Sequence, residues 1–273
     1  MLEPTTAQAL DFALALAAEA DAIALRTFRS PRREAEVRVK ADGTLVTRAD
    51  TAVEAMLRRE IAQRFLSYAV LGEEQGYVAG ASGEAGNAPR WVIDPIDGTH
   101  NFVRGIPIWA TLIAFQRGGV VEAGVASAPA LGWRWWAGRE LGAYRAPLRD
   151  GAIGPAERIH VSDGDTIAEA QVLYGSYPLT LDAWGGRAEG LLRACWRARG
   201  FGDFWGHCLV AEGAAEVMLE GEIKPWDIAA LLPIIEEAGG RLTDIEGRTT
   251  IEAGHSITTN GVLHDDVLRR LRA

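Results

Sequence analysis

The sequence contains very little cysteine. Its two cysteines, Cys195 and Cys208, do not form a paired metal-ligand motif, and two cysteines cannot supply the disulfide framework of a small secreted domain. We therefore expect both thiols to be reduced residues of the protein interior.

Positive charge and uninterrupted hydrophobic runs are also scarce. The chain has 28 lysines and arginines against 37 aspartates and glutamates, which gives a formal net charge of −9. This balance disfavours nucleic acid or an anionic membrane as the main partner. The first 28 residues are rich in alanine and leucine, but Glu3, Asp11, Glu19 and Asp21 interrupt them. We expect an amphipathic helix of a cytoplasmic protein there, in place of a signal peptide.

What the sequence does have is apolar material for a large core, since 48% of its 273 residues are hydrophobic. The first helix would begin at Thr5 or Thr6 and end near Phe28, and a second would begin near Asp50 after a capping box at Thr47–Asp50. Residues 76–89, rich in Gly, Ala and Ser, are expected to form a mobile surface excursion. Short strand-like runs, of which the later ones predict an antiparallel meander, cover residues 37–40, 69–72, 91–93, 108–116, 120–126, 134–137 and 143–145.

Beyond residue 150 strands and helices alternate, which predicts an α/β layer. The expected strands are 172–176, 216–219, 241–243 and 257–259, and the expected helices are 187–199, 206–214, 226–238 and 263–271. The chain would thus divide into an N-terminal α+β subdomain, residues 1–150, and a C-terminal α/β subdomain, residues 151–273.

The stretch WVIDPIDGTHNF, residues 91–102, concentrates groups that could carry chemistry. Its apolar start predicts a buried strand, and Pro95 and Gly98 would end the strand where Asp94 and Asp97 emerge. Carboxylates at a strand end can hold Mg²⁺ together with waters and substrate phosphate. The alternative is an ordinary turn with two solvated aspartates.

Three further acids lie in similar polar breaks. Glu73 follows the strand 69–72, and Asp227 follows Lys-Pro-Trp in the first turn of a predicted helix, where a carboxylate also complements the helix dipole. Asp50 fits a capping position by itself. Spacing alone does not bring Asp227 next to Asp94, so a structural role stays open for each.

Four segments together resemble the inositol monophosphatase superfamily of Mg²⁺-dependent, lithium-sensitive phosphatases. They are VKADGTLVTRAD at 39–50, GEEQG at 72–76, WVIDPIDGTHNF at 91–102 and KPWDIAALLPIIEEAGG at 224–240. The resemblance implies a layered αβαβα sandwich, with N-terminal helices on an antiparallel sheet and a C-terminal α/β layer. It also implies a homodimer that acts on a small-molecule phosphate ester, with two or three Mg²⁺ ions and no nucleic-acid or membrane partner.

The same resemblance implies a role for each site residue. One Mg²⁺ would be held by Glu73, Asp94 and the carbonyl of Ile96, and a second by Asp94, Asp97 and Asp227. The catalytic set would be Glu73, Asp50 and Thr99, because Thr99 bonded to Asp50 would orient the attacking water. The phosphate would meet Asp97, Gly98, Thr99 and Asp227. Lys40 would lie in a loop that contributes to a third metal position.

Two segments are most similar to the histidinol-phosphate phosphatases of bacterial histidine biosynthesis: NFVRGIPIWATLIAF after the metal loop and FGDFWGHCLVAEGAAEVMLEGE at 201–222. Glu220 falls where the superfamily has a substrate-contacting acid, and Asp203 would add a carboxylate that suits the cationic histidinol. Helix capping is the alternative for Asp203, and His100 departs from the usual pattern. The rivals to L-histidinol phosphate hydrolysis are an inositol-1-monophosphatase or broader sugar or nucleotide phosphatase, and a non-catalytic metal- or phosphate-binding regulatory protein.

Overall fold

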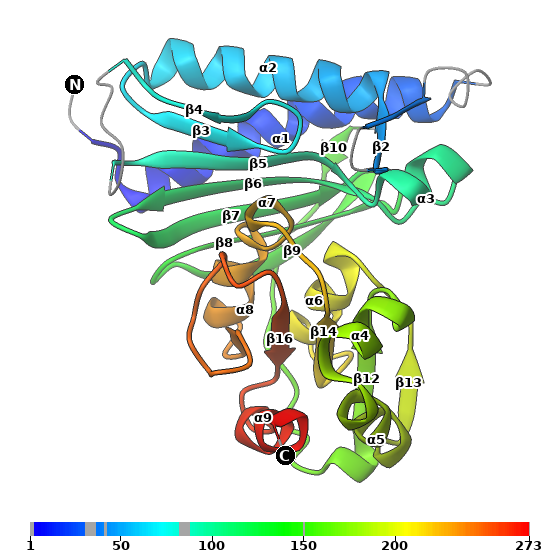
Figure 1. Cartoon of the computed structure of the whole chain (residues 1–273). Helices are drawn as coiled ribbons and strands as arrows, with labels where there is room; N and C mark the ends of the chain where they lie inside the picture. Colours follow the sequence, from blue (N-terminus) through cyan, green and yellow to red (C-terminus); the bar gives the residue numbers. More distant parts are fainter. Residues whose placement is uncertain (1–2, 31–36, 41–42, 82–87, 150, 273) are drawn as a thin grey trace.

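The computed structural model describes residues 3–30, 37–40, 43–81, 88–149 and 151–272. Two long helices, α1 (Thr6–Phe28) and α2 (Arg48–Arg64), lie side by side on one face of a large sheet (Figure 1). Both begin with the predicted caps: the Thr5 side chain accepts a hydrogen bond from the amide of Gln8, and Thr47 and Asp50 form a reciprocal capping box. Among the described residues, no helix is both long enough and apolar enough to cross a bilayer.

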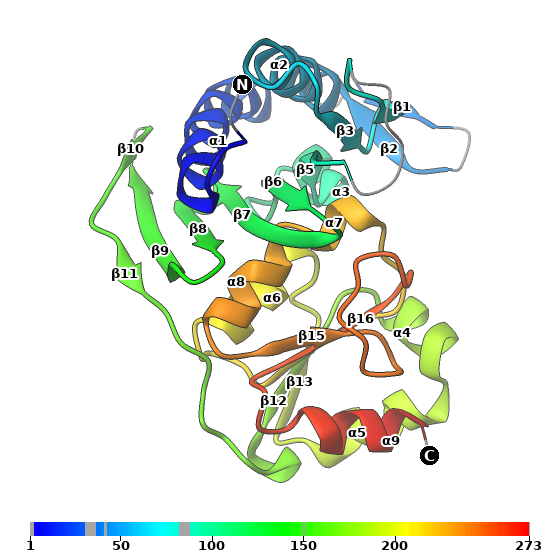
Figure 2. The ribbon, with the colours of Figure 1, turned by 90° about the vertical axis from the view of Figure 1, so that its left-hand side faces the viewer.

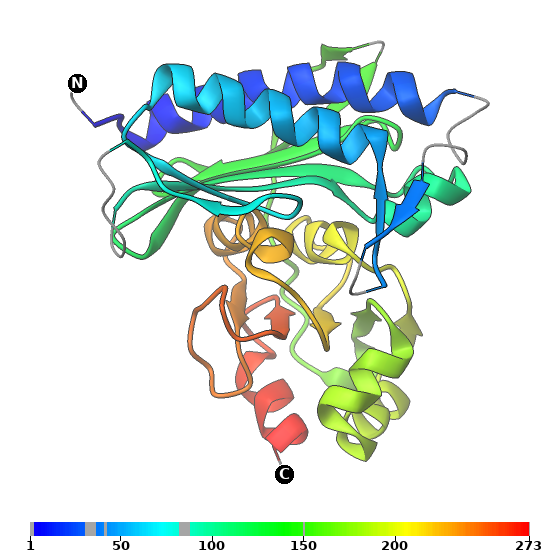
Figure 3. The same cartoon turned by 45° about the horizontal axis from the view of Figure 1, so that its top comes forward.

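The large sheet has nine strands within the described ranges, in the order β10-β9-β8-β7-β6-β5-β3-β4, with β11 paired to β9. Neighbouring strands are antiparallel except β3 and β5, which run parallel. A separate hairpin of β1 (Val37–Val39) and β2 (Leu45–Thr47) projects past α3 (Thr99–Arg104) (Figure 3). The strands of the sheet are β3 (Ala69–Gly72), β4 (Gly76–Val78), β5 (Arg90–Asp97), β6 (Ala110–Arg117), β7 (Val120–Ala128), β8 (Trp133–Gly138), β9 (Gly142–Arg149), β10 (Ala152–Ile153) and β11 (Glu157–Arg158).

A second helical layer covers the opposite face of this sheet (Figure 2). It consists of α6 (Phe204–Ala211), α7 (Pro225–Ile228) and α8 (Leu231–Glu237). Gly124 of β7 permits a very close approach here, because a Cβ at that position would overlap the carbonyl of Ala230 between α7 and α8. A hydrophobic core that includes Trp135 from the sheet and Phe204 from α6 fills the space between the two layers.

A five-stranded sheet in the order β13-β12-β14-β16-β15 forms the next layer, and outer helices cover its far face (Figure 2). The layers therefore follow the predicted αβαβα order. The strands are β12 (Gln171–Tyr174), β13 (Arg197–Arg199), β14 (Val217–Glu220), β15 (Arg241–Thr243) and β16 (Ser256–Thr259). The outer helices are α4 (Tyr177–Trp184), α5 (Gly186–Ala194) and α9 (His264–Arg272), preceded by the short 3₁₀ helix Ile167–Glu169.

Several predicted elements were wrong in detail. The helix expected over 187–199 ends at Ala194, and residues 197–199 instead pair with β12, because sheet pairing outweighs their local preference for helix. The helix expected over 226–238 is divided into α7 and α8, since Pro233 has no amide to continue the bonding through Ala229. Residues 76–78, expected in a loop, form β4, while 82–87 lie outside the described residues. Helix α4 was missed.

Candidate active site

The end of β5 delivers two carboxylates through an irregular pairing with β6. The register shifts between Asp94 and Asp97, around Pro95, which has no amide to give to the sheet. The Thr111 hydroxyl donates to the carbonyl of Pro95 at 2.9 Å and secures this bulge. Gly98 follows in the left-handed region at φ +83°, a conformation that favours glycine, and α3 begins directly after it.

Asp94, Asp97 and Asp227 meet at this strand end. A carboxylate oxygen of each lies within 4.8 Å of the others, and α7 brings Asp227 there from the distant end of the sequence. Burial, followed by the charges of neighbouring acids that include Glu73, raises the pKa of Asp94 well above its usual range. Burial likewise raises the pKa of Asp227, to about 7. Oxygen ligands packed against one another in a buried site fit a hard divalent cation.

Hydrogen bonds orient these three carboxylates. Asp94 accepts the amide of Ile96 at 2.9 Å, and Asp227 accepts the amide of Lys224 at 2.7 Å. Asp97 accepts the amide of Phe204 at 2.8 Å, so it also caps α6 from a distant part of the chain. Each carboxylate thereby has one oxygen directed by the backbone.

A second acidic group, Asp50, Glu73 and Glu74, lies beside the first. Lys40, the residue predicted for a third metal position, places its ammonium 2.9 Å from Glu73 and 2.7 Å from Glu74. Burial raises the pKa of Glu74 to about 7, although Lys40 opposes this shift. The lysine therefore supplies positive charge where these carboxylates gather.

Thr99 connects the two acidic groups. Its hydroxyl lies 3.0 Å from the carbonyl oxygen of Ile96 and 3.4 Å from Oδ1 of Asp50. Oδ2 of Asp50 accepts the amide of Thr47 at 2.8 Å, so one carboxylate both caps α2 and faces Thr99. Burial raises the pKa of Asp50 to about 6, against the effect of the Thr47 hydrogen bonds.

Two further acids border the cluster. Asp203 stands at the N-cap position of α6, yet its side chain makes no capping hydrogen bond, which corrects the capping alternative. Its backbone has φ +46°, which is uncommon for a residue other than glycine. A Cβ on Gly98 would lie 3.1 Å from Oδ2 of Asp203, so this carboxylate faces the metal loop. Glu220 is buried, and its carboxylate has no hydrogen-bond partner among the described residues.

The structure thus brings the predicted site residues into one region. The neighbouring charges that affect the pKa of Asp94 come from Glu73, Asp97, Asp227 and Asp50, and those that affect Asp97 include Asp203 and Glu220. His207 on α6 is buried, with Nδ1 2.8 Å from the Thr258 hydroxyl, so its ring is part of the protein interior.

Sequence reasoning missed the support behind Glu73. Glu54 on α2 is fully buried and accepts the amides of Glu74 and Gln75 at 2.8 and 3.0 Å. Arg58, one turn later, donates to Glu54 and to the carbonyl of Gly76. The spacing of four residues between Glu54 and Arg58 on the predicted helix is the sequence signal that could have indicated this ion pair.

The chain was also compared with known proteins. A model of the inositol monophosphatase family matches residues 6–273. The chain is 42% identical to a histidinol-phosphatase of Mycobacterium tuberculosis, over 97% of this chain and 98% of that protein. It is 41% identical to a histidinol-phosphatase of Streptomyces coelicolor, over 95% of each. A solved structure of an IMPase from Thermotoga maritima superposes with a TM-score of 0.79 at 30% identity, covering 96% of both chains.

Proposed function

Because the chain belongs to the inositol monophosphatase family, it is a phosphoric monoester hydrolase, and we propose that it converts L-histidinol phosphate to L-histidinol and phosphate in histidine biosynthesis. One observation carries the choice of substrate. Asp203 places a carboxylate against the metal loop without using it as a helix cap.

The recognition of histidinol would use this carboxylate together with Glu220. Histidinol carries an ammonium and a titratable imidazole, and hydrogen bonds between ionised groups are the strong ones. Glu220 is buried with no other partner in the described residues, so it is available for a donor on the substrate. An uncharged polyol would bring no counter-charge to either acid.

The family is metal-dependent, and the two acidic groups suit a hard cation. We infer that Glu73, Asp94 and the Ile96 carbonyl hold one Mg²⁺, that Asp94, Asp97 and Asp227 hold a second, and that the region of Lys40 contributes to a third, weaker position. When bound, such cations neutralise the phosphate dianion, lower the pKa of a water and stabilise the leaving oxygen. A dimer that works in the cytoplasm is part of the same proposal.

The chain's own groups would position the reactants. Thr99 would orient the attacking water through its hydroxyl and pass a proton towards Oδ1 of Asp50, whose other oxygen is fixed by Thr47. The backbone amides of Gly98 and Thr99 would hold the phosphate oxygens. The turn at Gly98 supports this role, because its left-handed conformation is one that an L side chain would strain.

Substrate comparison tests the proposal. The purified protein with Mg²⁺ is assayed against L-histidinol phosphate, inositol 1-phosphate, fructose 1,6-bisphosphate and adenosine 3′,5′-bisphosphate. We expect the highest kcat/KM for histidinol phosphate. Equal or better hydrolysis of inositol 1-phosphate would reject the assignment and favour the broader phosphatase.

The variant Asp203→Asn tests the carboxylate itself, because asparagine has nearly the same shape as aspartate and removes only the charge. We expect kcat/KM for histidinol phosphate to fall about tenfold or more, the scale of losing a charge-assisted hydrogen bond. Hydrolysis of p-nitrophenyl phosphate, which has no cationic group, should change much less. Equal losses on both substrates would show that Asp203 acts on the fold or the metals.

A further inference from the structure

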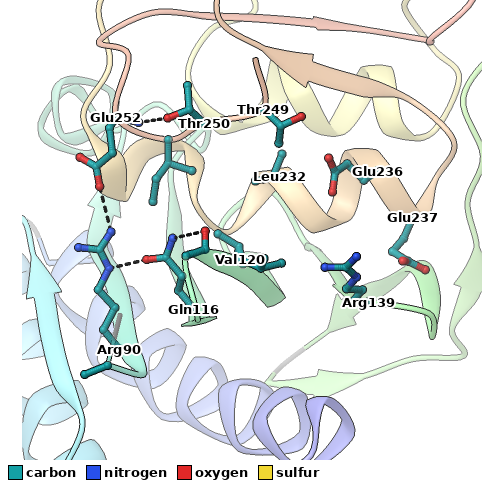
Figure 4. Close-up of a pocket in the computed structure, with 14 residues that line it drawn as sticks. Arg90, Gln116, Val120, Arg139, Leu232, Glu236, Glu237, Thr249, Thr250 and Glu252 are labelled. Carbon is teal, nitrogen blue, oxygen red and sulfur yellow. Dashed lines mark hydrogen bonds and ion pairs between the residues drawn. The ribbon is translucent and has the colours of Figure 1, made fainter. Parts of the chain in front are cut away.

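A separate pocket of about 610 Å³ opens at the end of β5 opposite to Asp94 and Asp97 (Figure 4). Arg90, the first residue of β5, lines it, together with the turn between β6 and β7, the C-terminal part of α8 and residues 249–252. Its volume lies in the range of small-molecule sites. The proposed function assigns nothing to it.

Part of the charge in this pocket is already paired. Arg90 donates hydrogen bonds to Gln116 and, at 2.9 Å, to Glu252. The ion pair with Glu252 connects the large sheet to the C-terminal half of the chain. Glu237 accepts the amides of Glu140 and Gly142, each at 2.8 Å. These groups form walls of the pocket and are not free for a ligand.

Arg139 and Glu236 are different. Within the described residues, neither side chain forms a hydrogen bond or an ion pair, although both line the pocket. They are close enough to interact: burial raises the pKa of Glu236, and the charge of Arg139 opposes that shift. Figure 4 places both on the side away from the Arg90 group. Both side chains are exposed, so a cation and an anion that make no hydrogen bond in the described residues face the same space.

The remaining lining combines two threonines, Thr249 and Thr250, with apolar side chains. Val121, Leu232 and Ile251 are 4–6% exposed and belong to the core between the sheet and α8. Small sites of this kind bind an apolar group against such side chains and fix its orientation by a few polar contacts. The ligand should thus combine a carboxylate, an ammonium and a hydrophobic side chain.

We propose that this pocket binds a free α-amino acid with an apolar side chain, whose carboxylate meets Arg139 and whose ammonium meets Glu236. A guanidinium matches the two oxygens of a carboxylate, and both contacts are charge-assisted. The amino acid fills the space between the two side chains and covers Val121 and Leu232.

Isothermal titration calorimetry of the full chain tests this site with L-leucine, L-methionine and L-phenylalanine. At least one of them should bind saturably, and removing either ionic contact should weaken binding about tenfold or more. Two analogues of leucine test the ionic contacts one at a time. L-leucinol has no carboxylate, and 4-methylpentanoate has no ammonium. The absence of binding by all three amino acids, or equal binding of the analogues, overturns the proposal.

Variants locate the binding. Arg139→Gln and Glu236→Gln should each weaken it to the same degree, whereas Arg149→Gln, at an exposed position outside the pocket, should not. Asp94→Asn should bind the amino acid like the wild type, because it alters only the acidic cluster. Loss of binding in Asp94→Asn, or full binding in Arg139→Gln, contradicts the site, and thermal unfolding confirms that each variant is folded. None of these results depends on which phosphate ester the enzyme hydrolyses.

Discussion

Asp50 shows how a single side chain can serve both the fold and the site. One of its oxygens caps α2 through the amide of Thr47, and the other faces the hydroxyl of Thr99. A capping acid is worth about 1 kcal/mol of stability. The capping hydrogen bond therefore stabilises the Asp50 rotamer that the proposed reaction requires.

Replacing Thr99 tests this pair. Thr99→Val removes the hydroxyl at nearly constant volume, and we expect kcat to fall about 100-fold, the scale of a lost proton-transfer or water-positioning group. Thr99→Ser restores the hydroxyl and should retain most activity. The rise in melting temperature on adding Mg²⁺ should be similar in both variants. A fully active Thr99→Val would remove Thr99 from the mechanism.

Among the elements, α9 is attached to the small sheet by a directed chain of hydrogen bonds. Thr243 donates to the carbonyl of Asp244, so its oxygen accepts from Nε2 of His264 at 2.9 Å. Thr259 accepts the amide of Gly261 and donates to Nδ1 of the same ring at 2.9 Å. This arrangement requires a neutral imidazole with its proton on Nε2.

The stability of the protein should therefore depend on pH through His264. Burial lowers its pKa from 6.5 to about 4, so the unfolded chain takes up this proton first as the pH falls. The stabilising contribution of His264 is complete above pH 6.5 and is lost as the pH falls towards 4. At pH 5 this loss amounts to up to about 2 kcal/mol of the free energy of unfolding. Urea unfolding of the wild type and His264→Gln at pH 7.5 and pH 5 measures the difference. Equal pH dependence in both proteins would show that His264 does not titrate on unfolding.

At the scale of the whole molecule, the acidic cluster joins the two halves of the chain. Asp94 and Asp97 end a strand of the large sheet, and Asp227 belongs to the helical layer that packs against it. Without a cation the negative charges of these carboxylates repel one another across this junction. Burial, together with this repulsion, raises the pKa of Asp94. Metal binding should therefore strengthen the contact between the halves.

Removing the metal tests this coupling. At about 100 times the dissociation constant, Mg²⁺ should raise the melting temperature above its value in EDTA by about 5 to 10 °C. Asp227→Asn should lose most of this rise, while in EDTA it should melt no lower than the wild type because one repelling charge is gone. Asp182→Asn, at an exposed position on α4, is the matched control. If Mg²⁺ did not change the melting temperature of the wild-type protein, the metal assignment would be contradicted.

Local sequence signals predicted individual elements, and the family resemblance implied the layers and the grouping of the acids, but neither gave the detailed geometry of the site. The caps at Thr5 and Thr47 and the strand before Asp94 have local signals, so they were predictable. The position of Asp227 beside Asp94 depends on packing between layers, and only the family resemblance indicated it. The strand β13 depends likewise on pairing with β12, which local preference does not contain.

The late place of Asp227 in the sequence has a consequence for biosynthesis. A ribosome completes Asp50, Glu73, Asp94 and Asp97 long before it reaches α7, so a growing chain carries the early acids without the last one. Their mutual repulsion would keep that edge of the sheet solvated until the C-terminal half docks. Because Asp227 lies in that half, the cluster of Asp94, Asp97 and Asp227 is complete only after this docking.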